Sequence, residues 1–414
     1  MTAPLPPPSP SSAPPPRGDS VPLLFGMTSL FADMTYEMAH VLLPALMLHL
    51  GGTGMATALM ESLAEGTRMG GFLFSGRLGG VPRREILLVR GGYGLTVLST
   101  VLMGAAGSAG ALIALKSLSW FGKGLRGPAR DALLSNALPP ELLARAFGTV
   151  QSLDQVGGIT GPLLALALAG FLSPAHLLFL GALPGVLCLA FSVLATRRAA
   201  AEQRKTQDGH ASAPGLFSSS VRGHLIRPDI RIYFLGGTLL RAGMLPATLL
   251  MFRFASEGGS FPVTVVGFLL ASLLTVLANL GIVRKILPQS PRPLMGIAAF
   301  LIASSALLLA RGGAHPAAYL LAMTAWGAGE ACAMVGLKVR GAALWPPELR
   351  SRGFALFEIS AALLSLLLWP LLAHLWDRGE TAFGMGVAAL AAAAGGGLLL
   401  LEKGKAERSS GGRG

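Results

Sequence analysis

The sequence PPELLARAF at residues 139–147 returns as PPELRSRGF at residues 346–354. The shared residues are separated by 207 positions (346 against 139), which is half of the 414-residue chain. A fixed internal period of this length indicates two homologous halves in tandem. Both copies lie between long apolar stretches, so the repeated unit is expected to be a bundle of membrane helices and not a soluble domain.

The composition is that of a membrane protein. Hydrophobic residues make up 52% of the chain and charged residues 13%, whereas a soluble domain carries about a quarter charged residues. Parallel six-helix repeats are a recurrent arrangement in secondary transporters. The expected fold is therefore all-α and integral to the membrane, with twelve transmembrane helices in two six-helix bundles related by a parallel repeat. Apolar stretches near the ~20 residues needed to cross a bilayer are predicted at 22–50, 56–78, 86–108, 111–135, 146–172, 175–196, 229–254, 262–286, 293–311, 315–338, 353–376 and 381–402.

Basic residues are distributed unevenly between the predicted loops. The formal net charge is +13, and the outer loops contain little of it beyond Arg253, Arg311 and Arg378. This asymmetry is the positive-inside pattern, and it predicts that both termini are cytoplasmic. The basic charge therefore indicates topology in a lipid bilayer, and a nucleic-acid partner is not expected.

Polar stretches divide the chain into five parts. Residues 1–20 are rich in Pro and Ser and lack the apolar middle of a cleavable signal, so a disordered cytoplasmic arm is expected. The first six-helix bundle is predicted over 21–198 and the second over 229–402. A cytoplasmic inter-domain loop is expected over 199–228, and a cytoplasmic tail over 403–414.

Two predicted helices contain regularly spaced glycines. In the fourth, GKGLRGPARDAL at 122–133 follows Lys116, and in the fifth, GGITGP occupies 157–162. This resembles the major facilitator superfamily, whose fourth helix carries a basic residue followed by Gly-x-Gly and whose fifth carries Gly-x-x-x-Gly-Pro. The first run is also similar to a poorly characterised bacterial branch with a GKGxRxPxRDAL motif. Helix packing is the role expected for Gly157, Gly161 and Pro162.

The resemblance also implies a charge network that latches the inner gate, and the chain departs from it. Gly80 stands where the family has an Asp, although Arg83 and Arg84 follow. Lys116 stands where exporters of the superfamily have an Arg, and a Lys cannot make the same bidentate contacts. The motif at 157–162 is similar to one associated with exporters, which favours efflux.

Three ionisable residues share one face of the first predicted helix. Asp33, Glu37 and His40 are four and three residues apart, and Asp33 lies about 12 residues, or ~18 Å, into the helix. A charge near the bilayer centre costs several kcal/mol, so it persists where it faces a cavity or a partner. This face predicts a proton relay or a cation site. The structural alternative is that Asp33 pairs with a base and His40 bonds a backbone carbonyl.

Further charges lie in the second and fourth predicted helices. Glu61 and Glu65 share a helical face, and a Glu65–Arg68 ion pair is the alternative to a role in the cavity. In the fourth helix, three bases at i, i+3, i+7 spacing either line an anion-attracting vestibule or pair with nearby acids. The bases are Lys123, Arg126 and Arg130, and the acids are Asp131 and Asp154.

The repeat predicts which charges face each other across the two halves. Adding 207 takes Lys123 to Glu330 and Gln151 to Glu358, and it takes Asp33 to the residue beside Arg241. Equivalent positions of the halves meet at the central axis, where substrates and coupling ions bind. Asp33–Arg241 and Lys123–Glu330 are therefore expected as pairs across a cavity, for transport or as static links.

The expected function is secondary active transport by alternating access, specifically proton-coupled efflux of a small solute across the bacterial inner membrane. A monomer without cofactors is expected. An enzyme is not, because no nucleophile has a base at usable spacing. The first alternative is a divalent metal transporter using Asp33, Glu37 and His40, which form a ligand set suited to borderline metals. The second is a receptor or scaffold that kept the fold and lost transport.

Overall fold

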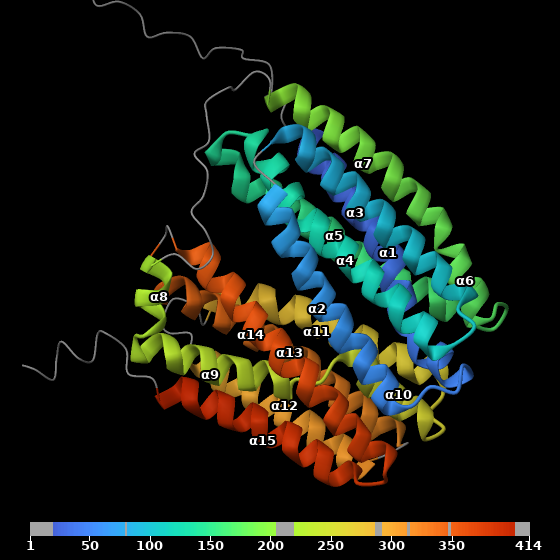
Figure 1. Ribbon diagram of the computed structural model, residues 1–414. Helices are drawn as coiled ribbons and strands as arrows, with labels where there is room; N and C mark the ends of the chain where they lie inside the picture. Colours follow the sequence, from blue (N-terminus) through green and yellow to red (C-terminus); the bar gives the residue numbers. More distant parts are fainter. Residues whose placement is uncertain are drawn as a thin grey trace, which may run out of the picture.

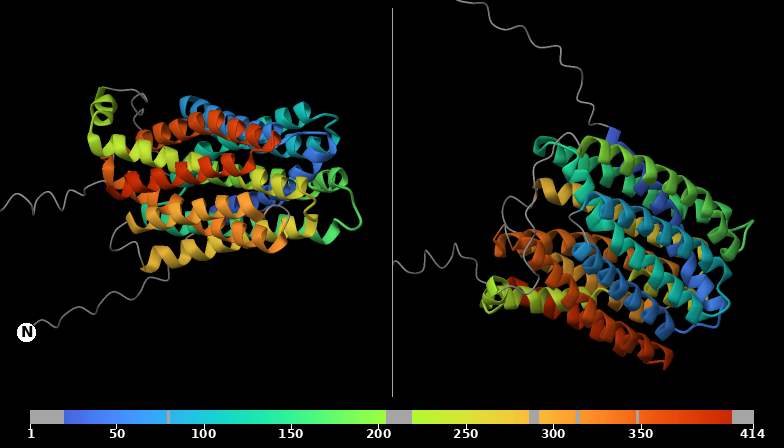
Figure 2. Two further views of the ribbon diagram at one scale, coloured as in Figure 1. Left: turned by 90° about the horizontal axis from the view of Figure 1, so that it is seen from below. Right: turned by 45° about the horizontal axis from the view of Figure 1, so that its top comes forward.

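The computed structural model describes the chain over 20–78, 81–203, 219–285, 292–312, 315–346 and 349–401. Within these ranges the regular secondary structure is helical, and no strand occurs. The helices run roughly along one direction, as the left-hand view of Figure 2 shows. The predicted arm up to residue 19, the tail from 402, Gly80 and the second half of the Pro-Pro pair at 346–347 lie outside the described residues.

Helices from the first half of the chain form one group (Figure 1). Within it α1 packs most extensively on α5, and α2 and α3 pack on α4. Ser108 begins α4 by accepting a hydrogen bond from the backbone N–H of Ala111 at 3.2 Å, the usual role of an N-cap serine. The members are α1 (Ser20–His49), α2 (Gly54–Leu78), α3 (Pro82–Leu102) with the short 3₁₀ turn Met103–Ala105, α4 (Ala109–Asn136), α5 (Pro140–Leu168), α6 (Pro174–Leu180) and α7 (Ala182–Gln203).

Helices from the second half form the other group, drawn yellow-green to red in Figure 1. Here α12 packs on α13 and α15, and α9 packs on α15. The members are α9 (Pro228–Gly243), α10 (Ala247–Ser256), α11 (Phe261–Lys285), α12 (Arg292–Gly312), α13 (Pro316–Leu344), α14 (Arg350–Asp377) and α15 (Thr381–Leu401), preceded by the short α8 (Ser219–Leu225). The polar stretch 199–228 is thus not wholly loop, because α7 extends to Gln203 and α8 lies inside it.

Seven helical segments in the described part of the chain are long and apolar enough to cross a membrane. They include the paired segments Pro174–Gln203 and Pro228–Ser256, each of which joins two helices of the structure. Several charged residues of α1, α2 and α4 are buried, among them Asp33, Glu61 and Lys116. These three charges therefore lie inside the molecule.

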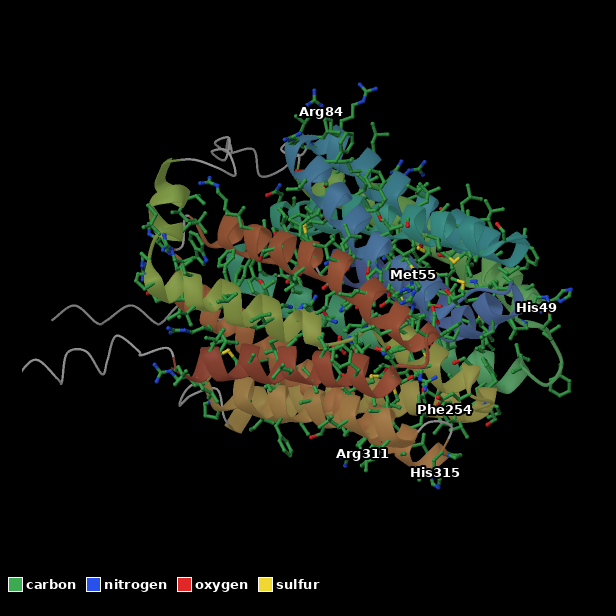
Figure 3. The ribbon with its side chains drawn as sticks, turned by 60° about the horizontal axis from the view of Figure 1, so that its bottom comes forward. His49, Met55, Arg84, Phe254, Arg311 and His315 are labelled. Atoms are coloured by element: carbon green, nitrogen blue, oxygen red, sulfur yellow. The ribbon has the colours of Figure 1, made fainter. Side chains whose placement is uncertain are left out.

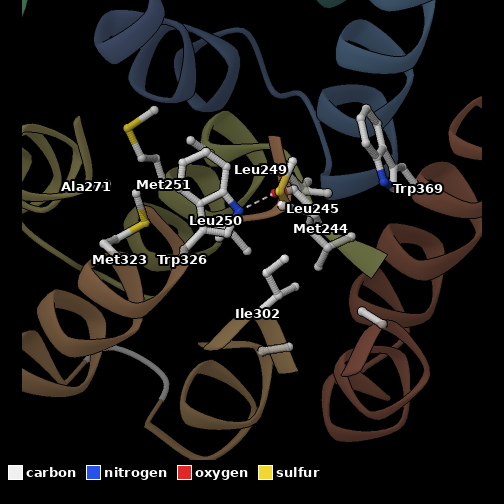
Figure 4. Packing of buried hydrophobic residues seen from close by; sticks show 14 of the residues in the cluster. Met244, Leu245, Leu249, Leu250, Met251, Ala271, Ile302, Met323, Trp326 and Trp369 are labelled. Atoms are coloured by element: carbon white, nitrogen blue, oxygen red, sulfur yellow. Dashed lines mark hydrogen bonds between the residues drawn. The ribbon is translucent and has the colours of Figure 1, made fainter. Parts of the chain in front are cut away.

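The stretch predicted as one helix over 229–254 is divided, which corrects the sequence-based expectation. Helix α9 ends at Gly243 and α10 starts after Pro246, whose ring fixes φ and removes a backbone donor. Two tryptophan side chains satisfy carbonyl groups beside the break. The Nε1–H of Trp326 donates to the oxygen of Leu245 at 2.8 Å (Figure 4), and that of Trp369 donates to the oxygen of Ala242 at 2.9 Å.

The two groups meet along α2 and α14, with further contacts from α1 and α2 to α10 and from α5 to α11. The hydrogen bonds between them lie toward one end of the molecule, where α1 ends and α2 begins. There the backbone N–H groups of Gly54 and Met55 both donate to the carboxylate of Asp377, at 2.8 Å each. Figure 3 shows His49 and His315 at this same end, away from α8.

Candidate functional site

A cavity of about 410 Å³ lies between the two groups of helices. Its lining comes from α1, α2, α4 and α5 on one side and from α9, α10, α11, α13 and α14 on the other. The structure thus gathers into one place charges that are far apart in the sequence. The residues singled out in the sequence that line this cavity are Asp33, Glu37, His40, Glu61, Glu65, Lys123, Asp154, Arg241 and Glu330.

Asp33 lies at the contact between α1 and α5. Its side chain is 5% exposed, and a Cβ placed on Gly157 would lie 3.0 Å from the Cβ of Asp33. Asp154, one helical turn before Gly157 on α5, also lines the cavity. The predicted Asp33–Arg241 ion pair is wrong, because these two described residues do not come within 4.0 Å of each other as a pair. The guanidinium of Arg241 instead contacts Glu358, which lies on its own side of the cavity.

Glu37 and His40 form a short chain that ends in the second group. The Nδ1 atom of His40 lies 3.6 Å from a carboxylate oxygen of Glu37, and its Nε2 atom is 2.5 Å from the hydroxyl of Thr248 on α10. The imidazole also stacks on Phe268 with ring centroids 5.2 Å apart. The alternative that His40 bonds a backbone carbonyl is therefore wrong, and its ring links the two groups through side chains.

Lys116 and Glu61 form a buried ion pair that the residue spacing did not predict. The Nζ atom is 3.5 Å from Glu61 Oε1, and the two side chains are 1% and 8% exposed. The ammonium group also lies 3.5 Å from the centroid of the Trp120 ring. A buried charge is tolerated when it is paired, so this pair neutralises two charges beside the cavity.

Arg68 and Arg241 both contact the carboxylate of Glu358 at the junction of α2 and α14. Arg68 donates to Glu65 on its own helix, with Nε 3.0 Å from Oε2, and Glu65 also lines the cavity, so the two alternatives for this residue are not exclusive. Glu358 lies 3.9 Å from Arg68 and 3.8 Å from Arg241. Glu358 therefore bridges the two groups.

The bases of α4 have different surroundings. The Nζ atom of Lys123 lies over the ring of Tyr36 at 4.0 Å, and no ion pair with Glu330 is present among the described residues, so that predicted pair is wrong. Arg126 is buried against the Tyr93 ring at 4.1 Å. Arg130 pairs with Asp131 at 3.0 Å and also donates to the hydroxyl of Ser29. Arg83 and Arg84 are exposed at the start of α3, outside the cavity lining.

The spaced glycines bring helix backbones together. A Cβ on Gly157 would lie 2.2 Å from the carbonyl oxygen of Leu30, and one on Gly161 would lie 2.6 Å from that of Met34. Pro162 is buried inside α5. On α4, a Cβ on Gly124 would lie 2.0 Å from the carbonyl oxygen of Arg68. Residues without a side chain at these positions let the helix backbones lie this close together.

The aromatic residues of the lining were missed in the sequence. They are Tyr36, Trp120, Phe268, Trp326 and Trp369. Tryptophan in membrane helices is enriched near the two interfaces, whereas the tryptophans of the lining lie well inside their helices. A tryptophan well inside a membrane helix is the sequence feature that could indicate a cavity lining, although a buried tryptophan is more often a packing residue.

Metal ligation requires several donor side chains to converge on one point. In the ranges that the structure describes, no group of three His, Cys, Asp or Glu side chains is arranged to hold a metal ion. Asp33 lies against α5 and His40 is bonded to Thr248 of α10, although both line the same cavity.

Known proteins resemble this chain in sequence. The model of the Major Facilitator Superfamily matches residues 25–370. An uncharacterised protein of Mycobacterium tuberculosis is 36% identical over 177 residues, 42% of this chain and 43% of that protein. An uncharacterised MFS-type transporter of Methanocaldococcus jannaschii is 31% identical over 143 residues, 34% of this chain and 36% of that one. The chain thus matches less than half the length of these curated relatives.

Solved structures share the fold at low sequence identity. The crystal structure of the nucleoside transporter NupG superposes with a TM-score of 0.75 at 14% identity, covering 92% of this chain and 98% of that one. The peptide transporter POT in complex with sulfate gives 0.73 at 15% identity, covering 92% and 94%. The helical architecture and the family match agree that this is a multi-pass membrane protein, and the chain belongs to the Major Facilitator Superfamily.

Proposed function

We propose that this chain is a proton-coupled exporter that works by alternating access, with twelve membrane-spanning helices in two six-helix halves. The observation that carries the proton coupling is Asp33. Its carboxylate is buried in the cavity lining, and its Oδ1 atom has no hydrogen-bond partner among the described residues. A buried carboxylate with an unsatisfied oxygen is stabilised by taking up a proton, so Asp33 and the neighbouring Asp154 are suited to exchange one.

The helix bounds support the two-half organisation. Helix α2 (Gly54–Leu78) and helix α11 (Phe261–Lys285) have starts and ends that differ by the same offset. Helices α4 and α13, which start at Ala109 and Pro316, differ by that offset as well. It equals the period of the repeated sequence at 139–147 and 346–354. The broken pair α9–α10 then corresponds to the unbroken α1, so the break is a feature of the second half.

The basic loop residues support cytoplasmic termini. With this orientation, the contacts between the groups indicate which side of the molecule is closed. The end where Asp377 joins α2 is then the outer end, and the hydrogen bonds between the groups concentrate toward it. We infer that the structure has its outer side closed. The cavity would then exchange with the cytoplasm, which is the side from which an exporter takes its substrate.

The divalent metal transporter is the weaker alternative. Asp33, Glu37 and His40 lie on one helix, but His40 is engaged by Thr248 of the other group. Metal binding requires deprotonated ligands that converge, and the described side chains do not converge in this way.

The proposal is tested in everted membrane vesicles whose lumen is acidified by respiration, with a fluorescent reporter of the pH gradient. A panel of organic cations, organic anions and neutral drugs is added in turn. We expect at least one solute to dissipate the gradient in wild-type vesicles, because each exported molecule enters the lumen in exchange for protons. Asp33→Asn should abolish this signal at equal protein level, since an amide cannot exchange a proton.

The matched control is Glu380→Gln, which removes an exposed carboxylate outside the cavity lining. It should behave as wild type. Full solute-dependent proton movement in Asp33→Asn would contradict the proposed role of Asp33 and reduce this residue to a packing element.

A further inference from the structure

The charges around the cavity do not cancel once the ion pairs are taken into account. Three bases have a carboxylate as a close partner: Lys116 with Glu61 at 3.5 Å, Arg241 with Glu358 at 3.8 Å, and Arg68 with Glu65. Each of these pairs is close to neutral. The charge that acts on a solute in the cavity therefore comes from the remaining ionisable side chains.

The remaining set is predominantly acidic. Four lining carboxylates have no Lys or Arg within 4.0 Å in the part of the chain that the structure describes; they are Asp33, Glu37, Asp154 and Glu330. Lys123 is the one remaining Lys or Arg of the described lining, which also contains the imidazole of His40. Arg126, which has no carboxylate within 4.0 Å among the described residues, lies against Tyr93 and does not line the cavity. When ionised, these carboxylates outnumber Lys123 by four to one.

A cluster of acids is not by itself a binding site, and Asp33 supplies an independent indication of a ligand. This side chain is more than nine-tenths buried and lines the cavity, and its Oδ1 atom has no hydrogen-bond partner in the part of the chain that the structure describes. Buried polar atoms are nearly always satisfied, so an oxygen without a protein partner in a cavity lining is a candidate contact for a proton or a ligand. Protons can neutralise some of the four carboxylates, and a positively charged solute can neutralise another.

Glu330 is the acid with the surroundings that an organic cation requires. Trp326 lies one helical turn before it on α13, and Trp369 and Phe268 complete the aromatic lining of the second group. The two indole N–H groups are used by backbone oxygens, which holds the rings in place. Aromatic rings attract cations through their faces, most strongly where water is excluded. Each group also contributes a base to the lining: Lys123 in the first group has no carboxylate within 4.0 Å among the described residues, whereas Arg241 in the second group is engaged by Glu358.

We propose that the exported solute is an organic cation, an amine or quaternary ammonium or phosphonium ion with an aromatic or aliphatic body. Its charge is bound at Glu330, and its body lies against Trp326, Trp369 and Phe268. Asp33 and Asp154 are left to carry protons. A cavity of about 410 Å³ is within the range that holds drug-sized ligands. An organic anion is disfavoured, since Arg241 is already engaged by Glu358.

This inference rests on the proposed transport function, but it can be tested separately by equilibrium binding. Purified full-length protein in detergent is dialysed against labelled tetraphenylphosphonium, a permanent cation with aromatic groups, and in parallel against labelled salicylate, an aromatic anion. We expect saturable binding of tetraphenylphosphonium and none of salicylate. Glu330→Gln should weaken cation binding by about tenfold or more, the loss expected when one desolvated charge contact is removed.

Two further variants keep the test decisive. Glu380→Gln, an exposed carboxylate of the same half, should bind as wild type. Phe268→Leu, which keeps an apolar side chain and removes a ring, should weaken binding several-fold even if Glu330→Gln fails to fold. Wild-type affinity in a folded Glu330→Gln variant, or salicylate binding without tetraphenylphosphonium binding, would overturn the proposal.

The two proposals fail in different ways. Binding in detergent needs neither a membrane nor a pH gradient. Cation binding without solute-driven proton movement in vesicles would contradict proton-coupled export and leave the cation site standing. Proton movement driven by anions alone would contradict the cation site and leave proton-coupled export standing.

Discussion

At the scale of single residues, the charged side chains buried between the helices differ in the partners that surround them. Lys116 is the clearest case, because it is 1% exposed and has both Glu61 and the Trp120 ring as neighbours. Asp33 differs, since among the described residues no Lys or Arg lies within 4.0 Å of its buried carboxylate. The contrast separates charges that hold the structure together from charges that stay available for chemistry.

The Lys116–Glu61 pair predicts a large loss of stability when one member is removed. Lys116→Met should lower the free energy of unfolding by about 3 kcal/mol, because breaking a buried pair leaves an uncompensated charge. The double variant Lys116→Met with Glu61→Gln should recover a large part of that loss, since no charge is then left unpaired. Thermal unfolding of the detergent-purified proteins measures both effects. Equal destabilisation by the single and double variants would show that packing, not charge, is what Lys116 supplies.

At the scale of helices, small residues and one proline set the geometry of the cavity. Gly157 and Gly161 allow α5 to approach α1 closely enough for Asp33 to lie beside α5. On the opposite side, Pro246 divides α9 from α10, and Met244 and Pro246 join the lining at the break. Discontinuous helices at the centre of a transporter commonly contribute to its binding site.

The α1–α5 contact provides a matched pair of glycine substitutions. Gly157→Ala should destabilise the protein by about 1–3 kcal/mol, because the new methyl group overlaps the backbone oxygen of Leu30 and the contact is already close-packed. Gly158→Ala is the control, since nothing lies within 4 Å of a Cβ at that position. It should leave stability unchanged or slightly higher, because alanine favours helix over glycine. Thermal unfolding distinguishes the two, and equal behaviour would contradict the close approach.

At the scale of the whole molecule, the two groups of helices are joined at one end by a carboxylate. Asp377 ends α14 and accepts hydrogen bonds from the first backbone N–H groups of α2. A helix N-terminus has unsatisfied donors and a partial positive charge, so an acid is favourable there. This contact links positions from opposite halves of the chain and lies on the side that we propose is closed.

Removing this link should open the molecule at that end. Asp377→Ala loses two hydrogen bonds worth about 1 kcal/mol each, which is enough to shift a conformational equilibrium severalfold. Spin labels on cysteines replacing the exposed His49 and Glu380, in a background without Cys188 and Cys332, report the separation of the groups by electron–electron resonance. We expect a larger population at long distance in Asp377→Ala. The exposed neighbour Arg378, changed to Gln, should leave the distance distribution unaltered.

The amino-acid sequence is sufficient to locate the helices and to find the acids of the first one. Each predicted apolar stretch falls largely on helix in the structure, because a bilayer demands about 20 apolar residues in succession and the chain shows them plainly. The spacing of the glycines pointed to the family, since close helix approach requires residues without side chains at fixed intervals. The face shared by Asp33, Glu37 and His40 followed from helical geometry alone.

Which charges pair and which stay free depends on tertiary packing. Lys116 selects Glu61 and Arg241 selects Glu358, although the repeat suggested other partners. Positional equivalence between halves does not set the rotation of each helix, and an ion pair depends on side-chain atoms coming within a few ångströms. The break before Pro246 and the aromatic lining around Glu330 arise in the same way. They depend on how helices from distant parts of the chain pack, and that packing is not encoded in any local stretch of sequence.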